Sequence, residues 1–134
     1  MNGLTVICIG SNVGDKYANV AETLAVFRTI LSGFQASDIY ESDDDSGLGQ
    51  PYANAVCAGF FNDRCENLHS LASTREKAYG RTPESKASGI MPLDIDIVVF
   101  NNEIVNSQQF DKPYFRHGLS QLTLHPYKCL HTHK

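Results

Sequence analysis

The stretch from Leu93 to Phe100 alternates acidic and apolar residues and then continues as an apolar run. Because successive side chains of a β-strand point to opposite faces, Asp94 and Asp96 share one face and the apolar residues between them share the other. Their Cα atoms would lie roughly 7 Å apart. A Mg²⁺ ion could be held there, since Mg²⁺ typically takes one or two carboxylates and fills its shell with water and substrate phosphates. The alternative is an edge strand whose acids face water.

Length, charge and cysteine pattern narrow the class of protein. The 134 residues suffice for a buried core, and we expect a single domain over 1–134 whose tail is exposed from about residue 126. A net charge of −4 does not favour binding to nucleic acid. No apolar run approaches the length of about 18 residues that a membrane span needs. Because the four cysteines form no CxxC pair and no signal peptide is recognised, we expect a reduced cytoplasmic location. The oligomeric state stays open.

Hydrophobic periodicity predicts an α+β fold. Compact apolar runs predict four strands, and apolar residues spaced by three and four positions predict two helices. The strands are expected over 4–9, 34–40, 52–61 and 92–100, and the helices over 15–31 and 64–79. This order, β-α-β-β-α-β, is typical of a ferredoxin-like domain with an antiparallel sheet and both helices on one face.

Cap and turn residues predict where these elements end. We expect Asp15 to cap the first helix, Gly33 to end it, and Gly80 to end the second helix. The pair Asn101-Asn102 predicts a tight turn after the acidic strand, followed by a short strand over 103–105. Leucines at positions 119, 122 and 124 predict a last short helix or irregular packing.

Four short motifs follow one another along the chain. They are Ile9-Gly10-Ser11-Asn12, Gln50-Pro51-Tyr52-Ala53-Asn54-Ala55, Glu76-Lys77-Ala78-Tyr79-Gly80-Arg81 and Leu93-Asp94-Ile95-Asp96-Ile97. Each is weak alone, but in this order they resemble the 6-hydroxymethyl-7,8-dihydropterin pyrophosphokinases of folate synthesis over about residues 4–106. The resemblance implies transfer of a pyrophosphoryl group from ATP, as co-substrate, to the hydroxyl of the pterin, with Mg²⁺ as cofactor.

The resemblance also implies a pterin site. Its residues would be Gly10, Ser11, Asn12, Ser42, Tyr52 and Asn54. The Asn54 amide would read the donor and acceptor edge of the pterin, because an amide offers both kinds of group. The ring of Tyr52 would lie over the pterin, since aromatic faces suit stacking. Taken alone, Tyr52 and Asn54 would instead be interpreted as a strand-edge aromatic and a turn residue.

A second set of residues is implied for the nucleotide and the metal. Asp94 and Asp96 would hold two Mg²⁺ ions that bridge the ATP phosphates and the pterin hydroxyl, and Arg81 would join them as a catalytic residue. The nucleotide would be bound by Glu76, Arg81, Ile97 and Arg116. Arg116 lies close to an arginine of the family but not at the same spacing.

Several positions depart from the family pattern. Pro83, Ser88, Met91 and Tyr114 stand where the family carries Arg, Trp, Arg and His. An arginine finger can increase the catalytic rate by a factor of roughly 10³–10⁵. These losses therefore predict weak nucleotide binding and slow catalysis. Lys77 and Lys86 could compensate in part as point charges. The loop over 80–92 is mostly small and polar, so we expect nothing to anchor it on a core and expect it to be mobile.

Two alternatives stay open beside a pyrophosphokinase. One is a non-catalytic pterin-binding or interaction protein that kept the fold. The other is a divergent transferase that acts on another small hydroxylated substrate. A hydrolase triad is unsupported because Ser11 has no obvious His partner, and a P-loop kinase is excluded by the absence of a Walker A motif.

Overall fold

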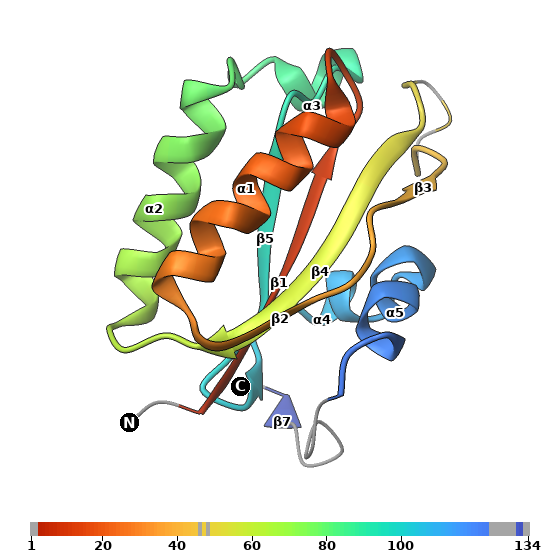
Figure 1. Cartoon of the computed structure of the whole chain (residues 1–134). Helices are drawn as coiled ribbons and strands as arrows, with labels where there is room; N and C mark the ends of the chain where they lie inside the picture. Colours follow the sequence, from red (N-terminus) through yellow and green to blue (C-terminus); the bar gives the residue numbers. More distant parts are fainter. Residues whose placement is uncertain (1–2, 46, 48, 124–130, 133–134) are drawn as a thin grey trace.

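A computed structural model of the chain describes residues 3–45, 47, 49–123 and 131–132 (Figure 1). The strands are β1 (Leu4–Ser11), β2 (Ser32–Ala36), β3 (Tyr40–Ser42), β4 (Tyr52–Phe60), β5 (Asp94–Phe100), β6 (Glu103–Ile104) and β7 (His131–Thr132). The helices are α1 (Lys16–Ile30), α2 (Cys65–Ala78), α3 (Ser85–Ser88), α4 (Ser107–Phe110) and α5 (Pro113–Ser120).

All of these strands belong to one sheet. Its order is β2-β4-β1-β5-β6-β7, and β3 pairs with β4 beside β2. Neighbouring strands run antiparallel except β6 and β7, which run parallel. Strand β1 therefore lies between β4 and β5, which are the third and the last strand of the β-α-β-β-α-β unit. This order confirms the predicted ferredoxin-like fold.

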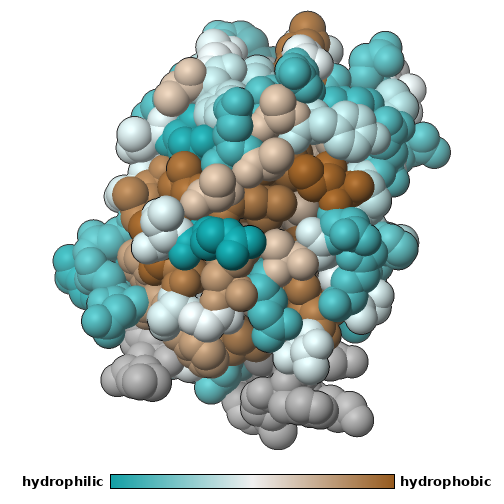
Figure 2. All heavy atoms as spheres, viewed as in Figure 1, coloured by the Kyte–Doolittle hydropathy of each residue, from teal (hydrophilic) through white to brown (hydrophobic). Residues whose placement is uncertain are grey.

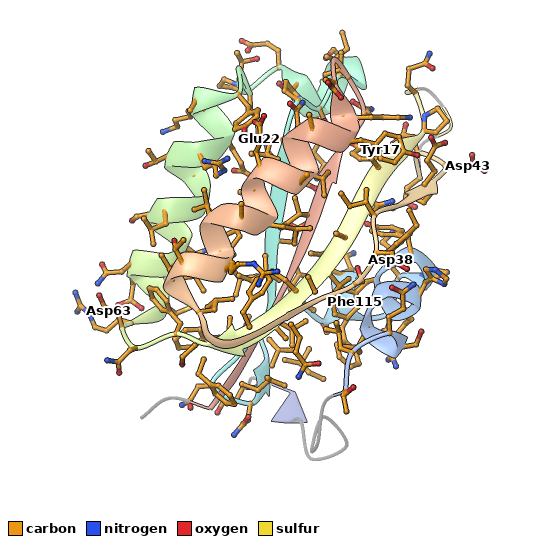
Figure 3. All side chains as sticks on the ribbon, in the orientation of Figure 1. Tyr17, Glu22, Asp38, Asp43, Asp63 and Phe115 are labelled. Atoms are coloured by element: carbon orange, nitrogen blue, oxygen red, sulfur yellow. The ribbon has the colours of Figure 1, made fainter. Side chains whose placement is uncertain are left out.

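Helices cover both faces of this sheet. On one face, Val20 and Phe27 of α1 and Leu68 of α2 pack against Ile7 of β1. On the other face lies a second core around Phe115 of α5, which is fully buried and points toward the sheet in Figure 3. The prediction of helices on one face is confirmed for the two long helices, while the short C-terminal helices add a second layer.

The groove between α1 and α2 is lined by apolar residues together with polar ones such as Asn67 and Arg75. Phe27, Ile30, Phe61 and Leu71 contribute to its lining, and Figure 2 shows hydrophobic side chains gathered in the middle of this face. None of the described helices combines the length and the apolar character that crossing a membrane would need.

The alternation along β5 places its side chains as expected. Leu93, Ile95 and Ile97 are buried in the core beneath α1 and α2. Asp94 and Asp96 therefore point to the opposite face of the sheet. β6 pairs with β5 only at Val99 and Phe100, so among the described strands β1 alone pairs with the part of β5 that carries Asp94 and Asp96.

Some predicted ends are confirmed and others are wrong. The Asp15 carboxylate accepts a hydrogen bond from the Ala18 N–H (3.3 Å), so Asp15 caps α1. Gly33 does not end this helix, because the chain is already extended at Leu31 and Gly33 lies within β2. The strand expected over 34–40 is divided into β2 and β3. At the division, the Ser37 hydroxyl, and not a backbone carbonyl, accepts a hydrogen bond from the Val56 N–H of β4.

The C-terminal part holds the largest differences from the expected elements. The last helix, α5, begins at Pro113, earlier than the leucines suggested, and α4 precedes it. In the expected exposed tail, residues 126–130 and 133–134 lie outside the described residues. His131 and Thr132 pair with β6.

Candidate functional site

A polar cavity of about 480 Å³ opens on the sheet face that α1 and α2 leave free. Strands β1, β4 and β5 form its floor. The segment after β3, the loop over 80–92 and the helices α4 and α5 contribute its walls. Residues expected at a functional site that line it are Gly10, Ser42, Tyr52, Asn54, Arg81, Asp94 and Asp96.

Strand register explains why these residues meet. Gly10 of β1 lies opposite Asn54 of β4 on one side and Asp94 of β5 on the other. A Cβ atom at Gly10 would lie 3.2 Å from the Tyr52 ring and 3.3 Å from the Asn54 side-chain oxygen, which is closer than ordinary contact. The missing side chain at Gly10 therefore lets Tyr52 and Asn54 reach over the floor.

Asn54 is the central polar residue of the strand floor. It is buried, and its amide NH₂ donates to the Ser42 hydroxyl at 2.8 Å. Beside it, burial and then the charge of Asp94 raise the pKa of Tyr52 to about 12, so its phenol is neutral. A fixed amide next to a half-buried neutral ring suits a flat heterocycle that carries donors and acceptors.

The two acids of β5 are held in different environments. Asp94 forms an ion pair with Arg81 at 3.0 Å. Burial, and then the neighbouring Asp94 carboxylate, raises the pKa of Asp96 well above its usual range. A cation bound between the two would relieve this cost, because an opposite charge favours the ionised form of a carboxyl.

Arg81 is positioned by a second acid. The Glu76 carboxylate accepts hydrogen bonds from the Arg81 guanidinium and from the Ile95 N–H (2.7 Å). Glu76 is largely buried behind the arginine and does not line the cavity, and its burial raises its pKa. Glu76 therefore holds Arg81 in place.

The pair of β5 acids fits Mg²⁺ better than a metal that needs many protein ligands. Among the described residues, no group of three or more His, Cys, Asp or Glu side chains forms a metal site. Mg²⁺ commonly binds proteins through one or two carboxylates and takes its other ligands from water and phosphates. The donor set of this cavity matches that pattern.

Comparison with known proteins decides the family. Residues 6–129 match the family 7,8-dihydro-6-hydroxymethylpterin-pyrophosphokinase, abbreviated HPPK. The chain belongs to the HPPK family.

Named relatives agree with this assignment. A 2-amino-4-hydroxy-6-hydroxymethyldihydropteridine pyrophosphokinase of Bacillus subtilis is 29% identical over 126 residues, which cover 87% of this chain and 71% of that protein. A folate synthesis bifunctional protein of Arabidopsis thaliana is 29% identical over 113 residues, or 83% of this chain. The match spans 23% of the Arabidopsis protein, so this HPPK chain corresponds to about a quarter of that relative.

Besides Glu76, four residues expected at the HPPK site do not line the cavity. The Ser11 hydroxyl bonds with Asn19 of α1 (3.2 Å), and Ile97 is buried in the core beneath the long helices. Arg116 donates to the Phe110 carbonyl (2.7 Å) and pairs with Asp111, which turns it away from the cavity. The fourth is Asn12, which contacts the loop over 80–92.

The loop over 80–92 is anchored, contrary to the sequence-based expectation. The Asn12 side chain donates to the Gly89 carbonyl (2.8 Å) and accepts from the Met91 N–H (2.7 Å). Met91 and Ser85 of the loop are buried. The expectation that nothing holds this loop is therefore wrong, because the sequence does not reveal that Asn12 lies against it.

Sequence reasoning missed several cavity residues. Cys8 lies on the floor opposite Asp96, and α4 adds amide side chains to one wall. The missed lining residues include Asp43, Asp44, Asp45, Asn106, Gln108, Gln109 and Lys112. Helix α4 has four residues, too few to show a helical period. Of the four departures from the family pattern, Met91 and Tyr114 line the cavity, and Pro83 and Ser88 do not.

Proposed function

We propose that this chain transfers pyrophosphate from ATP to the hydroxymethyl group of 6-hydroxymethyl-7,8-dihydropterin, with Mg²⁺, in folate biosynthesis. The observation that carries the proposal is that one cavity contains both Asn54 with Tyr52 and the acid pair Asp94 and Asp96. Membership of the HPPK family supports the same reaction. We also propose that the 134 residues act as one domain in the cytoplasm, with the pterin and ATP as small-molecule partners.

The pterin would bind on the strand floor. Asn54 would hydrogen-bond to the heterocycle edge, and Ser42 would hold the amide in its orientation. The Tyr52 ring would cover one face of the pterin. Gly10 leaves the room that this arrangement needs.

The phosphates would bind over β5. Asp94 and Asp96 would hold two Mg²⁺ ions, which supply charge neutralisation for phosphoryl transfer. Arg81 would lie beside them, oriented by Glu76. Ile97 could contribute only through its backbone: the Ile95 N–H points away from β1 to Glu76, so by alternation the Ile97 N–H points to the same edge. We assign no nucleotide contact to Arg116.

A second function is favoured by one observation. Met91 and Tyr114 line the cavity at positions where the resemblance led us to expect Arg and His. With those charges lost, the site could keep pterin binding and lose transfer. This is the non-catalytic pterin-binding protein.

An assay of AMP formation separates the two functions. With ATP, the dihydropterin and Mg²⁺, we expect AMP release that depends on all three. Asp94→Asn or Asp96→Asn should lower the rate by at least about 100-fold, or roughly 2.7 kcal/mol of barrier. Asp38→Asn, an exposed acid away from the cavity, is the matched control and should leave the rate unchanged (Figure 3). Pterin binding without any AMP formation would support the non-catalytic protein instead.

A further inference from the structure

The cavity carries more acid than base. Five carboxylates line it, from Asp43, Asp44, Asp45, Asp94 and Asp96, against three cations, from Arg81, Lys86 and Lys112. Even with Mg²⁺ on Asp94 and Asp96, a polyphosphate entering this space meets the carboxylates of Asp43, Asp44 and Asp45, so its binding depends in part on which protein cations are free to turn toward it.

Arg81 is already committed to other groups. Its guanidinium pairs with Glu76 and Asp94 through Nη1, so a phosphate that approached this nitrogen would compete with two carboxylates. Lys86, exposed on α3, and Lys112, at the start of α5, come from two separate walls. No ion pair of Lys86 is found among the described residues.

Lys112 is held by a partner that a phosphate group can replace. Its ammonium lies 2.9 Å from the Asp45 carboxylate, and the two side chains are 37% and 56% exposed. Exposed ion pairs are weak, because water and salt screen them and two long side chains must be ordered. A phosphate group, which offers more negative charge than one carboxylate, can therefore displace Asp45.

We propose that Lys112 leaves Asp45 when the nucleotide binds and, together with Lys86, neutralises its phosphates. The two lysines supply charge that Met91 and Tyr114 do not provide. Asp45 competes with the phosphates for Lys112 and so weakens nucleotide binding. This inference rests on the proposed function and adds to it the residues that recognise the phosphates.

The two other lysines within the part of the chain that the structure describes do not fit this role. Lys77 lies exposed on α2 and does not line the cavity, so the sequence-based suggestion that it compensates for lost arginines finds no support in the geometry. Lys16 donates to the Pro51 carbonyl (3.1 Å) and pairs with Glu41 outside the cavity. Lys77 therefore offers a matched control.

Binding of a non-hydrolysable nucleotide tests the exchange without relying on catalysis. The probe is the Mg²⁺ complex of α,β-methylene-ATP, measured by calorimetry at low salt. Lys112→Met and Lys86→Met should each weaken binding by about tenfold, and Lys112→Arg should restore most of it. Asp45→Asn should strengthen binding by about threefold, since it frees Lys112. Lys77→Met should change nothing, and pterin affinity should be the same in all variants.

The outcomes separate this inference from the proposed function. If the parent protein binds the probe and both lysine variants bind it equally well, the lysines have no such role and the proposed function stands. If Asp45→Asn weakens binding as Lys112→Met does, the pair is structural and the exchange is wrong. If the parent protein binds no Mg²⁺–nucleotide at all, the proposed function itself fails.

Discussion

At the scale of single residues, the absence of a side chain at Gly10 shapes the proposed pterin site. A methyl group there would press on the Tyr52 ring at 3.2 Å and on the Asn54 side-chain oxygen at 3.3 Å. The backbone of β1 would accept alanine, since glycine weakens a strand. The substitution Gly10→Ala therefore tests whether a ligand needs the space above the strand floor.

We expect Gly10→Ala to lower pterin affinity by about tenfold, which corresponds to roughly 1.4 kcal/mol. The thermal midpoint of unfolding should change little, because the lower backbone entropy cost of alanine offsets the pressure of its methyl group on Tyr52 and Asn54. Titration of the pterin by fluorescence, with thermal unfolding of the same samples, measures both. Unchanged affinity would mean that the pterin does not bind over Gly10.

Asp96 should make stability depend on pH. Its pKa is raised by burial and by Asp94, so the folded protein holds this proton more tightly than the unfolded chain does. Its contribution to the free energy of unfolding is therefore fully present below about pH 4, the ordinary aspartate pKa, and is lost as the pH rises through the raised pKa. In the proposed function the ionised acid is the form that would bind Mg²⁺, so stability and metal binding would oppose each other here.

In the variant Asp96→Asn the side chain at position 96 cannot ionise. The variant should therefore not lose free energy of unfolding at this position as the pH rises. In EDTA, the variant should unfold at a higher temperature than the parent at about pH 8, and the difference should shrink toward about pH 4. Calorimetric scans across this range measure it. A difference in midpoint that does not change with pH would show that the ionisation of Asp96 has no part in it.

At the scale of elements, regular alternation along a strand could be predicted from the sequence, and long-range contacts could not. The pattern of β5 was enough to place Asp94 and Asp96 on the face away from the buried Ile95. It could not show that Asn12, more than 75 positions away, holds the loop over 80–92, because this contact depends on β1 and β5 being paired. Short elements such as α3 and α4 carry no period to detect.

The loop over 80–92 also separates two substitutions that the sequence treats alike. Met91 lines the cavity, whereas Pro83 is exposed and does not. We expect Met91→Arg to raise pyrophosphoryl transfer by about tenfold, or roughly 1.4 kcal/mol, because a long side chain can carry its guanidinium into the cavity. Pro83→Arg should have little effect. Equal gains from both, in steady-state AMP assays, would mean that the loop closes over the nucleotide in another arrangement.

At the scale of the whole molecule, the sheet separates two cores with different tasks. The core beneath α1 and α2 contains Leu68 and supports the sheet from behind. The core beneath α5 contains Phe115 and holds the helix that brings Lys112 and Tyr114 to the cavity wall. This division is invisible in the sequence, because the segments that form the cavity walls lie far apart along the chain.

Two large-to-small substitutions test the division. Phe115 and Leu68 are both fully buried, so Phe115→Ala and Leu68→Ala should lower the free energy of unfolding by about 3–5 and about 2–5 kcal/mol. Urea unfolding measures both. Under conditions where each variant is still folded, Phe115→Ala should weaken binding of the pterin and of the Mg²⁺–nucleotide complex by at least about tenfold, since α5 loses its packing against the sheet. Leu68→Ala should bind both as the parent does. If Leu68→Ala loses binding to the same extent, the two cores are not independent and the site responds to the stability of the whole sheet.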